Sequence, residues 1–151
     1  MTTLIAYDGR RNSEAALDKA IQHAIHYSEP LYILTVVRED QMDPENPDPA
    51  VREMMEAATA KASAEGVQAH SIIETGSPEN IVVDVAERFK CDTIVVGRSD
   101  KSVMGKLLLG SVSKAVIDSS IDVILVSARD ERSNRPSIHH SDSCLHCPFI
   151  R

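Results

Sequence analysis

Short apolar runs alternate with amphipathic segments along most of the chain. The runs are rich in isoleucine, valine and leucine and end at glycine, proline or acidic residues, which is typical of buried strands. Between them, apolar residues recur at the three- and four-residue spacing of a helix that buries one face. The expected strands span residues 4–7, 31–37, 67–73, 93–96 and 122–126, and the expected helices span 14–25, 50–64, 78–89 and 111–117.

Signals at the helix ends support this assignment. Asn12 or Ser13 is expected to cap the first helix, and Asp48 stands before a proline at the start of the second. Gly66 follows the second helix, where a left-handed residue commonly ends one. Three prolines mark residues 38–49 as a surface loop.

The alternation of strands and helices predicts the fold class. We expect an α/β protein with an open, doubly wound, five-stranded parallel sheet and helices on both faces. Such sheets bind ligands beyond the carboxyl ends of their strands. The first strand ends at Asp8 and the fourth at Gly97, so their end loops meet if the two strands are neighbours.

The chain divides into an α/β domain over residues 1–128 and a polar segment over 129–151, which we expect to be a flexible tail outside the fold. The spacing of Cys144 and Cys147 lets two thiolates share one Zn²⁺ ion. The candidate ligands are His139, His140, Cys144, His146 and Cys147. Adventitious metal binding is favoured over a structural site, because no second ligand pair is evident on an ordered element. A disulfide or a redox-sensing dithiol is a further alternative.

Composition narrows the classes of partner. The net charge of -7 and an aromatic content of 3% argue against a nucleic-acid binder, which needs a basic face or stacking platforms. No apolar run approaches the roughly 20 residues of a membrane span, and we see no signal peptide. We therefore expect a cytoplasmic protein. Three unevenly placed cysteines do not form a disulfide framework.

The stretch from Val95 to Ser113 has the chemistry of a phosphate-binding loop. Gly97 lets a ligand approach the backbone closely, and a helix that begins at Ser111 directs its free amides and positive dipole end at an anion. Serine hydroxyls and two lysines (Lys101 and Lys106) add donors and charge. The common phosphate motifs do not fit, because Gly105-Lys106 lacks the serine or threonine of a Walker A loop. The dinucleotide glycine motif is also missing after the first strand.

These residues resemble the universal stress protein family, whose nucleotide-binding members carry G-x2-G-x9-G-[ST] after the fourth strand. Gly97, Gly110 and Ser111 match this motif, whereas its second glycine falls on Asp100. Three further segments resemble the family, and the resemblance covers about residues 4–128. These segments are Ala6-Tyr7-Asp8-Gly9, Glu74-Thr75-Gly76-Ser77-Pro78 and Leu107-Leu108-Leu109-Gly110-Ser111-Val112-Ser113.

The resemblance implies a Rossmann-like fold of the adenine-nucleotide α-hydrolase type and a homodimer formed through the last strand. Some members bind ATP, with Asp8 and Val36 at the nucleoside and the glycine loop at the ribose and phosphates. The residues that the resemblance places at an ATP site are Ala6, Tyr7, Asp8, Val36, Val96, Gly97, Arg98, Asp100, Gly110, Ser111, Val112 and Ser113.

Asp100 leaves two interpretations open. A carboxylate about 4 Å from a phosphate costs roughly 4 kcal/mol at an effective dielectric near 20, which is about a thousandfold in affinity. A Mg²⁺ ion that bridges Asp100 and the phosphates turns this repulsion into attraction. The repulsion is also offset by the nearby cations Arg98, Lys101 and Lys106. Asp8 likewise either contacts a ligand or only turns the chain.

The sequence places no nucleophile beside a histidine and an acid, so we expect a non-enzymatic regulatory or stress-response module with at most incidental ATP hydrolysis. His23 and His26 are expected to be solvated, and Cys91 to be a core or boundary residue. The alternatives are a dimeric adaptor that binds no nucleotide and a metal- or redox-responsive protein that acts through the tail. An adenylating ligase would need a substrate domain for which this chain has no room.

Overall fold

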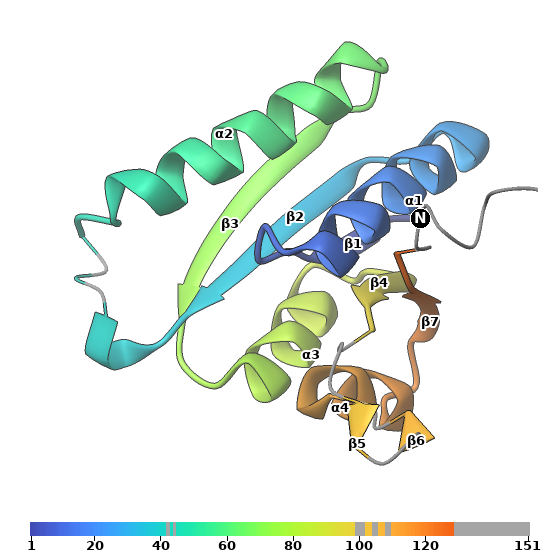
Figure 1. Cartoon of the computed structure of the whole chain (residues 1–151). Helices are drawn as coiled ribbons and strands as arrows, with labels where there is room; N and C mark the ends of the chain where they lie inside the picture. Colours follow the sequence, from blue (N-terminus) through green and yellow to red (C-terminus); the bar gives the residue numbers. More distant parts are fainter. Residues whose placement is uncertain (42, 44, 99–101, 104–105, 108–109, 129–151) are drawn as a thin grey trace, which may run out of the picture.

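The computed structural model describes residues 1–41, 43, 45–98, 102, 103, 106, 107 and 110–128. A five-stranded sheet in the order β3-β2-β1-β4-β7 forms its centre, and all four strand pairs are parallel. The elements of this sheet and its helices are β1 Thr3–Ala6, α1 Arg11–Tyr27, β2 Leu31–Val37, η1 Glu39–Gln41, α2 Pro49–Ala64, β3 Ala69–Thr75, α3 Pro78–Arg88, β4 Thr93–Gly97, α4 Ser111–Asp118 and β7 Asp122–Val126 (Figure 1). The expected fold class is confirmed.

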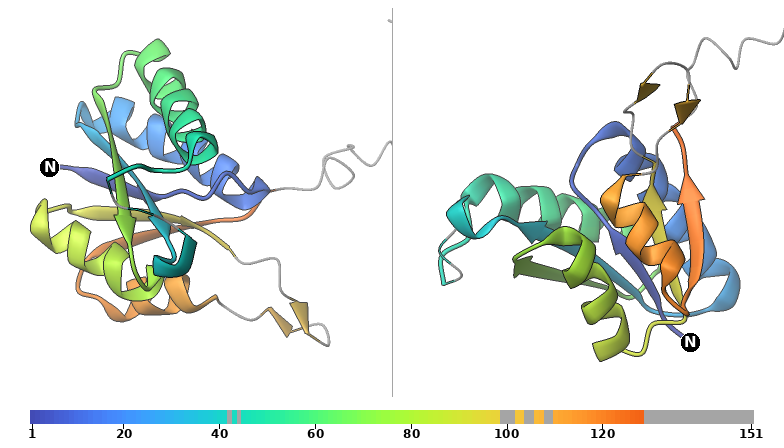
Figure 2. Two further views of the ribbon diagram at one scale, coloured as in Figure 1. Left: turned by 90° about the vertical axis from the view of Figure 1, so that its left-hand side faces the viewer. Right: turned by 90° about the horizontal axis from the view of Figure 1, so that it is seen from below.

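The helices lie in two layers, one on each face of the sheet (Figure 2). Helices α1 and α2 cover one face, where side chains such as Leu17, Ile33 and Met55 form a buried core. Helices α3 and α4 cover the other face over a second core that includes Leu4, Val85 and Ile94. Most residues of both cores are aliphatic, and among the described residues Tyr7 is the one aromatic side chain buried in the first core.

The start of α1 differs from the prediction. The helix begins at Arg11 with Arg10 as its cap residue, so neither Asn12 nor Ser13 caps it. The Ser13 hydroxyl instead donates to the Arg10 carbonyl and accepts from the Asp8 amide, at 3.0 and 3.3 Å. The Ser13 side chain therefore stabilises the turn that leads into the helix, and its position predicts a helix start that is later than the observed one.

Other boundaries follow the sequence more closely. Asp48 caps α2 as predicted, with its side chain accepting from the Ala50 amide at 2.9 Å. Strand β3 begins two residues later than expected, because the Val67 amide still donates to the Ala62 carbonyl at the end of α2. Two short elements were not predicted: the η1 turn, and a ribbon in which β5 Ser102–Val103 pairs antiparallel with β6 Lys106–Leu107.

Strands β1 and β4 are neighbours, so the loops that follow them meet, as a site shared by both requires. Ala6 pairs with Val96, so both strands end at the same edge of the sheet. From β1 the chain proceeds to β2 on one side and returns to β4 on the other. This reversal is the switch point at which open α/β sheets bind ligands. In the part of the chain that the structure describes, none of the helices combines the length and apolar character that crossing a bilayer requires.

Candidate functional site

The end of β4 lies directly against the first turn of α1. A Cβ atom placed on Gly97 would be 2.6 Å from the carbonyl carbon of Asn12 and 2.7 Å from its oxygen. Real Cβ atoms do not approach backbone this closely, so glycine is required for the contact. Gly97 thus brings the start of α1 and the end of β4 together at the carboxyl edge of the sheet.

The Asn12 side chain links three segments at this edge of the sheet. Its Nδ2 donates to the carbonyl of Arg98, and its Oδ1 accepts from the amide of Ala128 at 2.8 Å. The Arg98 amide donates to the Val126 carbonyl at 2.7 Å. With 8% of its surface exposed, Asn12 holds the chain after β4 and the chain after β7 against one helix. Sequence reasoning missed this role, because it treated Asn12 as a local cap.

Asp8 organises the turn after β1. Its Oδ1 accepts from the Arg10 amide at 2.9 Å, and its Oδ2 lies 3.8 Å from the Nε of Arg10. Asp8 therefore stabilises the turn, which is one of the two roles that the sequence left open for it. The Asp8 side chain is 59% exposed at the edge where β1 ends, so the turn does not bury the carboxylate.

Helix α4 begins at Ser111 and completes the same edge. Gly110 precedes it as an extended cap residue without a side-chain cap, and the Lys114 amide donates to the Gly110 carbonyl at 3.0 Å. The amides of residues 111–113 have no acceptor within the helix, and the positive end of the helix dipole lies there. Ser113 is buried, whereas Ser111 is exposed.

Five of the predicted nucleotide residues have side chains in the two cores, on opposite faces of the sheet. Ala6, Val36, Val96 and Val112 belong to one apolar cluster on the face covered by α3 and α4. The Tyr7 side chain belongs to the core on the opposite face, where its hydroxyl donates to Glu14. The structure therefore brings the four aliphatic side chains together on one face of the sheet and places the Tyr7 side chain on the other. Asp100 lies outside the described residues.

A charged network secures Tyr7 and α2 against α1. Burial and the Glu14 carboxylate raise the pKa of the Tyr7 phenol well above its usual range. Lys61 of α2 lies 2.6 Å from Asp18 and 3.8 Å from Glu14. The hydrogen bond with Asp18 raises the pKa of Lys61, so both its partners meet a charged ammonium group at neutral pH.

Among the described residues, no group of three or more histidine, cysteine, aspartate or glutamate side chains could hold a metal ion. The candidate zinc ligands of the tail, His139, His140, Cys144, His146 and Cys147, lie outside the described residues. The zinc site therefore stays a prediction.

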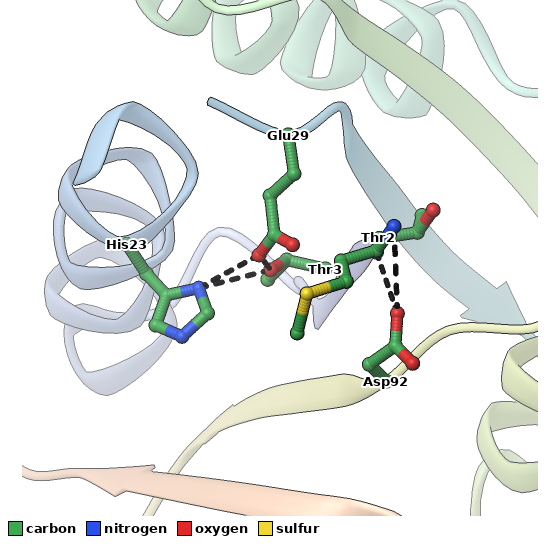
Figure 3. A network of polar contacts seen from close by, with 6 residues as sticks. Thr2, Thr3, His23, Glu29 and Asp92 are labelled. Atoms are coloured by element: carbon green, nitrogen blue, oxygen red, sulfur yellow. Dashed lines mark hydrogen bonds and ion pairs between the residues drawn. The ribbon is translucent and has the colours of Figure 1, made fainter. Parts of the chain in front are cut away.

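A second polar cluster lies at the opposite edge of the sheet, where β1 and β2 begin. Figure 3 shows His23 pointing toward Glu29 and Thr3, with its Nδ1 3.0 Å from an oxygen of each. The Thr3 hydroxyl donates to Glu29, so Nδ1 carries a hydrogen and donates to these oxygens. The prediction that His23 is solvated is wrong, because Glu29 needs a partner inside the fold. Thr3 is fully buried and cannot reach a substrate, so the cluster is structural.

Replacing Glu29 with alanine is expected to destabilise the protein by about 1–3 kcal/mol, because the buried Thr3 and His23 donors lose their acceptor. The side chain of Glu29 is only 4% exposed, so water does not readily replace it. Urea denaturation measures the change, and Glu29→Gln, which keeps an acceptor oxygen, is expected to lose less. Equal stability of the alanine variant and the wild type would contradict the role assigned to this cluster.

Cys91 is buried between α3 and β4, as the sequence predicted. Burial, together with the nearby Asp92 and Glu29 carboxylates, raises the pKa of its thiol to about 11. We expect the folded protein at pH 7 to leave Cys91 unmodified by iodoacetamide, because the thiolate is the reactive form. Peptide mass spectrometry checks this, with urea-unfolded protein as the control in which Cys91 reacts. Rapid alkylation of Cys91 in the folded protein would show that its burial is not stable.

The sheet order defines a doubly wound α/β protein whose switch point lies between β1 and β4. The sequence profile of the Universal stress protein family matches residues 1–127. The chain therefore belongs to the universal stress protein family, and the resemblance seen in its motifs is confirmed.

Curated relatives carry the same family name. The chain is 31% identical over 141 residues to universal stress protein YxiE of Bacillus subtilis, covering 82% of this chain and 95% of that protein. It is 32% identical over 81 residues to universal stress protein MJ0531 of Methanocaldococcus jannaschii, covering 54% of this chain. That second match spans about half of the relative's length, 48%.

Solved structures share the fold. A universal stress protein in complex with cAMP is similar with a TM-score of 0.71 and 24% identity, over 85% of this chain and 98% of the other. The universal stress protein from Archaeoglobus fulgidus in complex with dAMP has a TM-score of 0.63 and 19% identity, over 83% and 97% of the two chains. At these identities the likeness establishes the fold.

Proposed function

We propose that the protein binds an adenine nucleotide at the carboxyl ends of β1 and β4. One observation carries the proposal: Gly97 packs on the first turn of α1, at the edge where α4 begins beyond Gly110. Free amides at a helix start are natural phosphate donors. Similar folds in complex with cAMP and dAMP give further support.

The proposed contacts follow the arrangement of the edge. Asp8 and Val36 contact the nucleoside, because they lie near the carboxyl ends of the neighbouring strands β1 and β2. Gly97 and residues 110–113 contact the ribose and phosphates. Ala6, Val96 and Val112 support these contacts from the apolar cluster below, and the backbone of Arg98 continues the loop.

The bound nucleotide acts as a regulatory signal in this proposal. His23 lies at the opposite edge of the sheet, where its ring contacts Glu29. Cys91 is a protonated thiol in the core. Neither group is placed to act on a nucleotide at the β1–β4 edge, so any hydrolysis of ATP is expected to be slow.

Calorimetric titration of the metal-free protein with ATP, in the presence and absence of Mg²⁺, tests the proposal. Micromolar binding supports it, and a requirement for Mg²⁺ would show that a metal ion joins the phosphates. GTP is a matched control, because it carries the same phosphates on a different base. Absence of binding in both conditions would favour the dimeric adaptor that binds no nucleotide.

We further propose that the protein forms a homodimer through β7. This strand pairs with β4 on one side, and no strand of the described residues pairs with its outer edge, which offers backbone groups to a second chain. Residues 123–126 are partly exposed apolar positions along that edge. Sedimentation velocity tests the dimer, and a Leu125→Lys variant is expected to give monomers.

The tail contributes nothing to that dimer in our proposal, which treats residues 1–128 as the folded domain. A variant that ends at residue 128 is therefore expected to fold and to form the same dimer. Circular dichroism and sedimentation velocity measure both properties. Loss of the dimer on removal of residues 129–151 would contradict this division of the chain.

A further inference from the structure

Met54 of α2 packs against the turn that follows β1. Its Sδ atom lies 2.8 Å from the position that a Cβ on Gly9 would occupy, and its Cγ lies 3.5 Å from that position. Gly9 has a φ of +77°, so the turn already depends on glycine in the left-handed region. The thioether thus fills the space beside Gly9, between Asp8 and Arg10.

The two neighbouring methionines of α2 differ in exposure. Met54 is partly exposed and lies at the rim of the core beneath α1 and α2. Met55 is 2% exposed and belongs to that core. An oxidant in solution therefore has more access to the Met54 side chain than to the Met55 side chain. The pair offers a built-in comparison, because one helix carries both residues.

We propose that Met54 is an oxidative modification site, at which conversion to the sulfoxide by a hydroperoxide displaces the Asp8–Gly9 turn. In this step the sulfur lone pair attacks one peroxide oxygen, the O–O bond breaks and an S–O bond forms. The sulfur is oxidised by two electrons, and the other peroxide oxygen leaves as water or as an alcohol. The reaction changes an apolar side chain into a polar one.

The displacement follows from the packing around the sulfur. An added oxygen does not fit beside Gly9, where the sulfur is already in close contact, so it lies on the partly exposed side of Met54. The sulfoxide is larger and more polar than the thioether, so its contact with the turn and the apolar core beneath it is weakened, and Met54 moves away from the turn. The hydrogen bond from the Arg10 amide to Asp8 is then no longer held by the helix above it.

The consequence for ligand binding rests on the proposed function, because Asp8 is a proposed nucleoside contact. Oxidation is expected to lower the affinity for ATP by about tenfold, the factor that one lost hydrogen bond is worth. The movement of the turn does not rest on that function. It is measured separately through the backbone amide of Gly9.

The experiment uses the full chain with Met42 and Met104, which lie outside the described residues, replaced by leucine. Hydrogen peroxide treatment is followed by peptide mass spectrometry, by the NMR chemical shift of the Gly9 amide, and by ATP titration. A Met54→Leu protein in the same background is the matched control, because it keeps every cysteine and Met55. Met54→Gln mimics the sulfoxide without peroxide and is expected to show the shifted Gly9 amide before treatment.

The proposal expects sulfoxide at Met54 before Met55, a shifted Gly9 amide, weaker ATP binding, and reversal by methionine sulfoxide reductase. Met54→Leu should show none of these changes on treatment. Equal protection of both methionines, or an oxidised Met54 with an unmoved Gly9 amide, would overturn the proposal. A shifted Gly9 amide in a protein that never bound ATP supports the modification site and rejects the proposed nucleotide function.

Discussion

About a thousandfold tighter binding of ATP is expected from an Asp100→Gly variant than from the wild type when Mg²⁺ is absent. The family motif has glycine at this position, and the aspartate adds a negative charge to a loop for which we propose phosphate binding. A carboxylate about 4 Å from a phosphate costs roughly 4 kcal/mol at an effective dielectric near 20. Calorimetric titration of both proteins with ATP measures the difference.

Two controls separate charge from backbone shape at this position. Asp100→Asn removes the charge and keeps a residue that tolerates the left-handed region, so it should recover most of the gain if charge dominates. Adding Mg²⁺ should narrow the gap between wild type and Asp100→Gly, because the ion pairs with carboxylate and phosphate together. Equal affinities of wild type and Asp100→Gly without Mg²⁺ would show that Asp100 does not face the phosphates.

Gly97→Ala is expected to lower the free energy of unfolding by at least about 2 kcal/mol and to abolish ATP binding. The new methyl group would meet the Asn12 carbonyl carbon at 2.6 Å and the Ser13 amide nitrogen at 2.9 Å. These are backbone atoms of a helix and cannot rotate away as a side chain can. The first turn of α1 or the end of β4 must therefore move. Urea denaturation and ATP titration measure the two effects.

Gly66→Ala is the matched control for that variant. A Cβ on Gly66 meets nothing within 4 Å, but the residue has a φ of +80°. Its cost is therefore conformational alone, about 1 kcal/mol. Gly66 follows α2 on the way into β3, away from the β1–β4 edge, so ATP binding should be retained. Equal losses for the two variants would mean that close packing at Gly97 is not what the site depends on.

The alternation of apolar runs predicted the strand assignment well, because a strand buried on both faces has a continuous apolar sequence. The run at β2 matches its observed bounds, and Asp48 capped α2 as expected. Strand order did not follow from pattern, since the sequence does not state which strands pair. Only the structure shows that β4 lies beside β1, and this pairing is what places Asp8 and Gly97 at the same edge of the sheet.

The parts of the site that the sequence missed depend on contacts between distant residues. The residues around Asn12 predict a helix cap, whereas its side-chain partners are Arg98 and Ala128. The helical spacing predicts a solvated His23, whereas its ring contacts Glu29 and Thr3 beside the start of β1. The sequence predicts that a ligand approaches Gly97 closely, and the structure shows that the α1 backbone does so.

The two hydrogen bonds of Asn12 have a consequence for the order in which the protein folds. They join residues 86 and 116 positions apart along the chain, so they close after most of the sheet has formed. A chain that is still being synthesised, and whose β7 has not yet left the ribosome, cannot form both hydrogen bonds of Asn12. A nucleotide that binds at this edge would then bind only completely folded molecules. Its binding free energy would add to the free energy of unfolding of the native state. A higher nucleotide concentration would in that way raise the free energy of unfolding of the complete molecule.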